Sequence, residues 1–543
     1  MLYWYLLLVQ LLSVIVTGRT IGLDCEKDCN VDGTVIVCEH CIPQVVPKGV
    51  RNVRVMDNTM DLIYDHFNDT SWQSVEYLDI TESKRCTGHI RNNTFENMKS
   101  MTYLGLHLHE RFDHIDQIGG GNISGLRKVR HLNLTSCTRF SFEVLYTLLE
   151  SPHNFEKLDE LTLVSFNTLY GIVSLNSSFQ DILGTLGVNV LRLDYSPLPN
   201  YVTDPSTGMC SSVSELSVAY CNFRWTKPEY PMPWRSCASL RSLNITGSKG
   251  WTTFSSTEAS MCIINITEWC PFWAKNYQNV VNLILDDLLK PKEIPPLKYM
   301  FVGELNFTLD LETIYLRKNS LQYVNIEVHT NLFKHVKLVD LSENIIEYIN
   351  PTFLGNSAIT DVSLANNKRS KMAENSPYEF KNLLVYMNNL ETIDLSTNGL
   401  SSIPADWFKS NTKLKRKVLR DNKLSGFART EHILPEYIDL TYNLIQSFDL
   451  GTIEWFNNVS KMKENGTFIV NLAENPLQCT CDTFVQWLID SDFIDKNPPL
   501  ECFKKGTAVN ITSKMVETLE QECKQESSVW LYIIGSVCSV MLI

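Results

Sequence analysis

The chain has 543 residues, of which 44% are hydrophobic, and a formal net charge of -13. This length exceeds one ordinary domain, so the chain contains either several domains or an array of repeats. The negative charge repels polyanions and disfavours nucleic acid as a ligand, and the 16 cysteines, which lie mostly near the two ends, indicate an oxidising compartment.

The chain begins with a predicted signal peptide. Residues 1–18 form an apolar run that ends in the small residues Thr17 and Gly18, a pattern typical of a segment removed on secretion. Because no Lys or Arg precedes the run, a hydrophobic anchor that is not removed is the competing interpretation.

The next segment, residues 19–52, is predicted to be an N-terminal cysteine cap. Its cysteines lie within about seventeen residues, which is too short a stretch to bury a core without cross-links. They are Cys25, Cys29, Cys38 and Cys41. We predict two disulfides in this cap, and the sequence leaves three pairings open.

Residues 53–474 repeat a short pattern. Seven segments from IYLRKNSL to VNLAENPL share an apolar residue, any residue, an apolar residue, two further residues and then Asn. This is the leucine-rich-repeat signature, in which the alternating positions form a strand and the buried Asn amide satisfies backbone groups of the turn. The predicted asparagine ladder comprises Asn319, Asn344, Asn367, Asn398, Asn422, Asn443 and Asn475.

The same phase extends backward to Val53 and gives about sixteen repeats, with spacings from about 21 to about 40 residues. The ladder position of the earlier repeats holds Asn58, then Ser83, His109, Cys137, Phe166, Ser196, Cys221, Ser248 and Leu288. We therefore predict an α/β leucine-rich-repeat solenoid, a horseshoe with a parallel concave sheet and disulfide-stapled caps. Because the ladder is broken, its curvature is expected to change near residues 290 to 320.

Four cysteines have predictable places within the repeats. Cys137 and Cys221 occupy the ladder position, where a small buried thiol fits, so we predict that they are not cross-linked. Cys210 and Cys237 each precede the first strand leucine of a repeat by six residues. Successive rungs about 4.8 Å apart would stack them near bonding distance, which predicts a disulfide.

Three further cysteines lie in the repeat region. Cys262 and Cys270 fall in the longest repeat and are predicted to close a protruding loop. Cys86 is then left over, and an odd thiol in a secreted chain can be buried, reactive or intermolecular.

The last repeat runs directly into a second cysteine-rich segment, residues 475–526, which we predict to be a C-terminal cysteine cap. Its cysteines are Cys479, Cys481, Cys502 and Cys523. A zinc site is the alternative, but the spacing lacks a second short Cys pair and an oxidising compartment disfavours thiolate ligands.

Residues 529–543 form an uncharged apolar run of about fifteen residues, whereas a full membrane span needs about twenty. Three interpretations stay open: a truncated transmembrane helix, a short anchor or a glycolipid-anchor signal. The last is weakened because Ser527 and Ser528 adjoin the run without a polar spacer.

Sequons for N-linked glycosylation support secretion independently of the signal peptide. Eleven qualify: Asn68, Asn92, Asn122, Asn133, Asn176, Asn244, Asn265, Asn306, Asn458, Asn465 and Asn510. Asn133 and Asn244 lie between strand residues, so sugars on them would stand on the concave face and obstruct a ligand there. We therefore expect a lateral or convex ligand site, and we expect it near the break in the asparagine ladder, around residues 260 to 345.

Catalytic and metal-binding chemistry is not indicated. One segment has histidines with loose metal-ligand spacing, but their strand positions diverge, which favours ordinary surface or core roles. They are His107, His109 and His114. A basic cluster is interpreted as a solvated face: Lys413, Lys415, Arg416, Lys417 and Arg420. Three aspartates recur through the repeat phase alone, although they could form an acidic stripe: Asp340, Asp394 and Asp439. We predict no enzyme activity and no cofactor.

The order of signal peptide, cysteine cap, irregular repeats with a broken ladder, second cysteine cap and apolar segment resembles the ectodomain of a Toll-like receptor. The resemblance covers nearly the whole chain. It implies that Cys479 pairs with Cys502 and Cys481 with Cys523. It also implies innate immune recognition of a microbial or endogenous ligand, namely a protein, lipid or glycolipid, by a receptor homodimer or heterodimer. Such receptors signal through a cytoplasmic TIR domain, and this sequence contains none.

Two further hypotheses stay open. The chain could be a leucine-rich-repeat adhesion or matrix-binding protein, or a soluble decoy or co-receptor. For the Toll-like receptor hypothesis we expect a single-pass plasma-membrane protein with an extracellular N-terminus, attached through its C-terminal segment. A truncated product would be secreted.

Overall fold

The chain forms two compact units, unit 1 (Met1–Thr253) and unit 2 (Phe254–Ile543). The computed structural model describes residues 25–58, 64–82, 93–107, 125–135, 142–151, 154–165, 177–196, 209–221, 239–247, 280–284, 286–287, 310–319, 321, 323–324, 335–349, 358–367, 371–372, 377–404, 406–427, 429, 433–463, 468–480, 484–504, 506–522 and 524. The predicted signal peptide and the apolar C-terminal segment lie outside these residues. Among the helices that are described, none is both long and apolar enough to span a bilayer.

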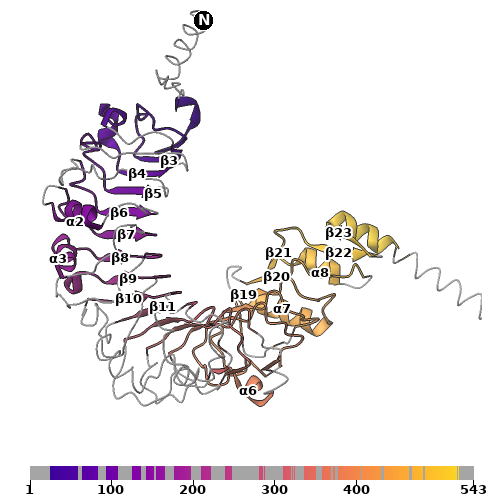
Figure 1. Cartoon of the computed structure of the whole chain (residues 1–543). Helices are drawn as coiled ribbons and strands as arrows, with labels where there is room; N and C mark the ends of the chain where they lie inside the picture. Colours follow the sequence, from indigo (N-terminus) through magenta and orange to yellow (C-terminus); the bar gives the residue numbers. More distant parts are fainter. Residues whose placement is uncertain are drawn as a thin grey trace, which may run out of the picture. The chain divides into compact units, whose positions relative to one another are not determined.

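Unit 1 is built on a sheet that begins with an antiparallel pair, β1 (Cys29–Asp32) and β2 (Val35–Glu39). All later neighbours are parallel, in chain order. They are β3 (Asn52–Asn58), β4 (Tyr77–Glu82), β5 (Tyr103–His107), β6 (His131–Thr135), β7 (Glu160–Val164), β8 (Val190–Arg192), β9 (Glu215–Ser217) and β10 (Ser242–Asn244). Figure 1 shows these strands in succession, with α2 (Phe142–Glu150) and α3 (Ser177–Leu186) along one side of the stack.

The core of unit 1 follows from the strand alternation. In β6 the side chains of Leu132 and Leu134 are buried, whereas His131, Asn133 and Thr135 are half-exposed on the other face, which we call the open sheet face. Short 3₁₀ helices within the described part of the cap and connections are η1 (Cys25–Asp28), η2 (Tyr64–His66), η3 (Thr70–Ser74) and η6 (Met209–Ser211).

Unit 2 continues the same construction. Its parallel strands are β11 (Asn282–Ile284), β12 (Thr313–Tyr315), β14 (Leu338–Asp340), β16 (Asp361–Ser363), β17 (Thr392–Asp394), β18 (Arg416–Val418), β19 (Tyr437–Asp439), β20 (Ile469–Asn471) and β21 (Ile494–Asp495). A short parallel pair joins β13 (Tyr323–Val324) to β15 (Tyr348–Ile349), and β22 (Glu501–Lys504) pairs antiparallel with β23 (Thr507–Asn510). The α-helices among the described residues of unit 2 are α6 (Pro377–Asn382), α7 (Leu450–Met462) and α8 (Phe484–Asp490). The predicted leucine-rich-repeat solenoid is confirmed.

The ladder asparagines of unit 2 tie each turn to the rung before it. The Nδ2 of Asn398 donates to the carbonyl oxygens of Leu395 and Ser396 in its own turn, at 2.9 and 3.0 Å. It also donates to the carbonyl of Leu364 in the preceding rung at 2.9 Å, and its Oδ1 accepts the N–H of Asn367 at 2.9 Å. The same bond to a leucine carbonyl of the preceding rung is made by Asn344, Asn367, Asn422, Asn443 and Asn475.

Shorter side chains make part of this connection in unit 1. The Ser196 hydroxyl donates to the carbonyl of Leu163 at 3.1 Å, and the buried Cys221 thiol donates to that of Leu193 at 3.0 Å. Cys221 is not disulfide-bonded, and burial raises its pKa to about 12. A separate bond between these rungs is made by Asp194, whose carboxylate accepts the N–H of Ala219 at 2.8 Å. Neighbouring repeats in this part of unit 1 are therefore hydrogen-bonded at the ladder position even though it holds no asparagine.

We expect Cys221→Ser to change the free energy of unfolding by less than about 1 kcal/mol, because a hydroxyl makes the same bond one rung earlier. Cys221→Val removes the donor and should cost about 1 kcal/mol more. Urea denaturation of the three proteins measures both values. Equal stabilities of the Ser and Val variants would contradict a role for the thiol proton.

One member of the basic cluster is not on the surface. Lys417 occupies the first core position of β18, is 0% exposed, and places its Nζ 4.5 Å from the centroid of the Phe408 ring. The interpretation of the whole cluster as a solvated face is therefore wrong for this residue. Burial lowers the pKa of Lys417 to about 7.

Candidate ligand-binding surfaces

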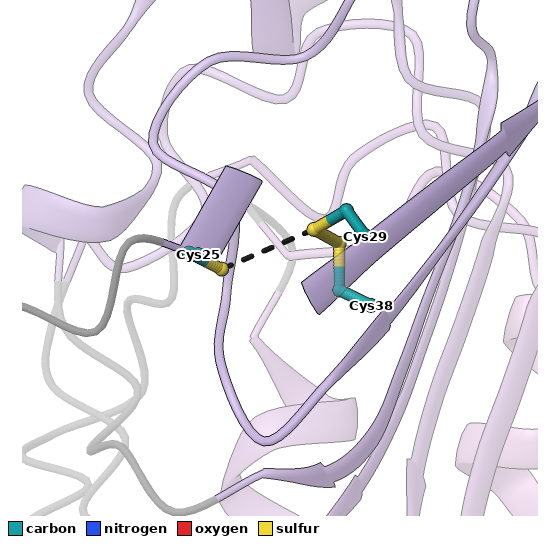
Figure 2. A group of neighbouring side chains, drawn as sticks. All are labelled: Cys25, Cys29 and Cys38. Carbon is teal, nitrogen blue, oxygen red and sulfur yellow. Dashed lines mark hydrogen bonds between the residues drawn. A yellow bond between two sulfur atoms is a disulfide. The ribbon is translucent and has the colours of Figure 1, made fainter. Parts of the chain in front are cut away.

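The N-terminal cap contains two disulfides, Cys25–Cys41 and Cys29–Cys38. Figure 2 shows the Cys25 sulfur facing the Cys29–Cys38 bond, and the sulfurs of Cys25 and Cys29 lie 4.0 Å apart. All three clustered cysteines are consumed in disulfides, so they offer no thiolate to a metal ion in this state. The cap closes the end of the sheet, because β2 pairs with β3.

The C-terminal cap is joined by Cys479–Cys502, the pairing that the resemblance implied. Its second predicted pair, Cys481 and Cys523, lies outside the described residues. In unit 1, Cys210 is disulfide-bonded, and its predicted partner Cys237 also lies outside them. Five more cysteines lie outside the described residues: Cys86, Cys137, Cys262, Cys270 and Cys538.

The sequons fall on two kinds of surface. Exposed sites off the open sheet face are Asn68, Asn458 on α7 and Asn510 on β23. Asn133 and Asn244 lie on the open sheet face of unit 1, as expected from the strand phase. The remaining sequons are not among the described residues: Asn92, Asn122, Asn176, Asn265, Asn306 and Asn465.

Aromatic side chains gather on the open sheet face of unit 1. Register places Tyr77, Tyr103 and His131 on successive strands. The rings of Tyr77 and Tyr103 stack with centroids 4.1 Å apart at 9°, and Arg54 lies over Tyr77 at 5.5 Å. The centroid of His131 lies 6.5 Å from that of Tyr103. These four residues form what we call the aromatic row.

A second group of polar side chains adjoins the aromatic row. The Asp79 carboxylate pairs with Nε2 of His107 at 2.9 Å, and the Tyr77 hydroxyl donates to it at 3.4 Å. Gly105 makes room for this arrangement, because a Cβ there would lie 2.2 Å from Asp79 Oδ1. Burial first and the Asp79 carboxylate second raise the pKa of Tyr77, so its phenol stays protonated.

Of the three histidines with loose metal-ligand spacing, only His107 lies among the described residues, and its ring pairs with the Asp79 carboxylate. His109 and His114 lie outside the described residues. Glu160 continues the polar network on β7, where it contacts Nδ1 of His131 at 3.3 Å and Nε of Arg192 at 3.2 Å. The open sheet face of unit 1 therefore carries connected aromatic and charged groups from β3 to β8.

The turns that follow the strands expose a different aromatic surface. The residue directly before the ladder position has a positive φ in most rungs, and we call this line of residues the strand-end edge. In unit 1 it includes Tyr195 (φ 57°) and Tyr220 (φ 54°), whose rings stack at 4.7 Å and 9°. They are 55% and 38% exposed. Gly247 follows in the next rung, where a Cβ would lie 2.2 Å from the Tyr220 ring.

The predicted ligand region, residues 260 to 345, is described only in part. There the carboxylate of Asp286 accepts from the backbone N–H of Arg317 at 2.6 Å and from its Nε at 2.7 Å. Burial raises the pKa of Asp286, against the effect of its hydrogen bonds with Arg317. This pair joins successive rungs where the ladder position holds Leu288, so its described role is structural.

The recurring aspartates of unit 2 also have backbone partners. Asp340, Asp394 and Asp439 each accept, through Oδ1, the N–H of the residue two positions later, at 2.9 to 3.0 Å. A hollow of about 380 Å³ lies at the turns of the same unit, lined by Glu343, Asn344, Ile345, Asn366, Asn367, Thr397 and Asn398. Its ladder amides are already bonded to the backbone.

The parallel rungs, buried ladder and disulfide caps define a leucine-rich-repeat solenoid. No family model matches the sequence. A segment of 111 residues is 30% identical to Tsukushi of Mus musculus; it covers 20% of this chain and 30% of that protein.

Solved structures with similar folds include the mouse RP105/MD-1 complex, at 14% identity and a TM-score of 0.44, covering 84% of this chain and 74% of that one. The glycosylated Toll–Spatzle complex of Drosophila matches at 13% identity and a TM-score of 0.40, covering 89% of this chain and 72% of that one. Human 5T4 matches at 18% identity and a TM-score of 0.34, covering 43% of this chain and 84% of that one. Similarities of this strength do not bear on function.

Proposed function

We propose that the chain is the ligand-recognition part of an extracellular receptor of Toll-like type, and that it binds its ligand without transforming it. The observation that carries this proposal is the stacked pair Tyr195 and Tyr220 on the strand-end edge of unit 1. Disulfides in both cap segments support an extracellular location. The predicted membrane segment, residues 529–543, belongs to the same proposal.

The backbone at the strand-end edge does not favour tyrosine. A positive φ suits Gly, Asn and Asp, whereas a bulky side chain there is uncommon and costs conformational energy. The equivalent turns of unit 2 hold Asp287, Lys318, Glu343, Asn366, Thr397, Asp421, Tyr442 and Glu474. Because Tyr442 lies between Asp421 and Glu474, these described turns hold no adjacent pair of tyrosines. Tyr195 and Tyr220 adopt a positive φ despite this conformational cost, and they also expose apolar surface. This is the arrangement expected where an aromatic ring contacts a ligand.

The strand-end edge also avoids the sugars expected on the open sheet face. Asn133 and Asn244 project from β6 and β10, whereas Tyr195 and Tyr220 lie in turns after β8 and β9. A ligand at the edge can therefore approach without crossing either attachment site. The proposed site is lateral, as expected from the sequons, but it lies before residues 260 to 345.

Binding of the secreted full chain to immobilised probes tests the proposal. The probes are bacterial lipopeptide vesicles, lipopolysaccharide and flagellin, with double-stranded RNA as the polyanion expected not to bind. Collagen and laminin represent the adhesion alternative. We expect binding to one microbial probe; binding to matrix proteins alone, or to no probe, would overturn the receptor proposal.

The double variant Tyr195→Asn/Tyr220→Asn should weaken that binding roughly tenfold or more while the fold is kept, because Asn tolerates a positive φ. Thr397→Asn is the matched control, since Thr397 is exposed at φ 54° in the equivalent turn of unit 2. Unchanged affinity of the tyrosine variant would place the ligand away from this edge.

A further inference from the structure

Asn133 has an aromatic neighbour at its attachment atom. On the open sheet face of β6, its Nδ2 donates to the hydroxyl of Tyr103 on β5 at 3.4 Å. Its Oδ1 accepts from the Thr135 hydroxyl at 2.9 Å, which joins the first and third residues of the sequon. The atom that would carry a sugar therefore lies directly beside the aromatic row.

The aromatic row offers the chemistry that a sugar ring needs. Tyr77 and Tyr103 present stacked apolar rings with hydroxyl tips, and sugars likewise combine apolar C–H faces with a rim of hydroxyl groups. Nδ2 loses one hydrogen when a sugar is attached and retains the other. The first sugar thus begins within one strand spacing, about 4.8 Å, of the Tyr103 rung.

We propose that the glycan attached to Asn133 packs its first N-acetylhexosamine against Tyr103. The aromatic row is then occupied by carbohydrate of the chain itself, and an external ligand must bind elsewhere. This inference rests on the proposed passage of the chain through the secretory pathway. It also explains why a connected set of aromatic side chains can coexist with a sequon at its centre.

Asn244 provides a matched comparison within the same protein. Its Oδ1 accepts from the Thr246 hydroxyl at 2.7 Å, as in the Asn133 sequon. Its Nδ2, however, donates to the Ser217 hydroxyl at 3.0 Å, and the preceding strand β9 carries Glu215, Leu216 and Ser217 without an aromatic ring. A sugar on Asn244 has the same strand position but no ring on the neighbouring strand.

The experiment uses the full chain secreted from glycosylating cells. Mass spectrometry of glycopeptides gives the occupancy of each sequon and the rate at which an endoglycosidase releases each glycan from the native protein. We expect release at Asn133 to be roughly three- to tenfold slower than at Asn244. Tyr103→Leu should abolish this difference, and Tyr103→Phe should preserve it because the ring remains.

The outcomes separate the two proposals. If no sequon carries a sugar, the secretory proposal fails. If other sequons are occupied but Asn133 is not, or if release at Asn133 and Asn244 is equally fast, only the packing of the Asn133 glycan is overturned. The comparison of the two sites in the unmodified chain stands even if the Tyr103→Leu variant does not fold.

Discussion

Replacing Lys417 by Met is expected to stabilise unit 2 by roughly 2–4 kcal/mol at pH 7. The amine is fully buried at a position that carries Ile393 and Ile438 on the two neighbouring strands, and burial lowers its pKa from 10.5 to about 7. Contact of the ammonium with Phe408 and Phe427 offsets part of the desolvation cost. Methionine fills a similar volume without a charge.

The pH dependence has a definite sign. The pKa of Lys417 is lower in the folded chain than in the unfolded chain, so the unfolded state binds more protons between about pH 7 and 10.5. The free energy of unfolding therefore rises with pH across that window. Below about pH 7 the amine is charged in both the folded and the unfolded chain, so its destabilising effect no longer changes with pH. In Lys417→Met this rise should be absent, so the difference from the wild type shrinks toward pH 10.

Chemical denaturation at pH 7, 8.5 and 10 measures both effects. Lys415→Met is the control, because Lys415 lies two residues away, is exposed, and pairs at 2.7 Å with Glu391. Its loss should leave the free energy of unfolding nearly unchanged, because solvent screens this exposed pair. Parallel pH profiles for the wild type and Lys417→Met would show that the buried amine does not titrate in this range.

Replacing Asn398 by Ala is expected to destabilise unit 2 by roughly 3–5 kcal/mol, because buried backbone groups in two rungs lose their partner. Asn398→Ser should cost less, since Ser196 shows that a hydroxyl at this position reaches the carbonyl of the preceding rung. Urea denaturation followed by circular dichroism measures the series. The exposed Asn388→Ala serves as the control.

The ladder would not be essential if Asn398→Ala and Asn388→Ala were equally stable. An intermediate free energy of unfolding for Asn398→Ser would show how much of the stability comes from the donating Nδ2 and how much from the accepting Oδ1. The donor half occurs without the amide in unit 1, where the Ser196 hydroxyl donates to the carbonyl of Leu163.

The fold was largely predictable because each rung repeats the same local pattern. The alternation of apolar residues set the strand phase, and the paired residues Val339, Val362 and Ile393 lie in one register. The ladder asparagines could be identified because their amides bond mostly to backbone groups, whose positions repeat with the rung. The same phase placed Asn133 and Asn244 on the open sheet face.

The surfaces were less predictable because they depend on contacts between rungs. Tyr77 and Tyr103 lie 26 positions apart in sequence and meet only through strand register. Tyr195 and Tyr220 could have been noticed as bulky residues directly before the ladder position, but their stacking depends on the length of the connection. The charged neighbours of Lys417 indicate a surface position, whereas the repeat pattern places it at a core position, where it is buried.

The ladder has a consequence for how such a chain can evolve. The side-chain amides of six ladder asparagines of unit 2 bond within their own turn and to the rung before, and in each case the acceptor in that rung is a leucine carbonyl. Deleting or duplicating one whole rung therefore recreates the same bonds at the junction. The array can change length by gain or loss of single repeats, whereas a partial repeat would shift every ladder position that follows it.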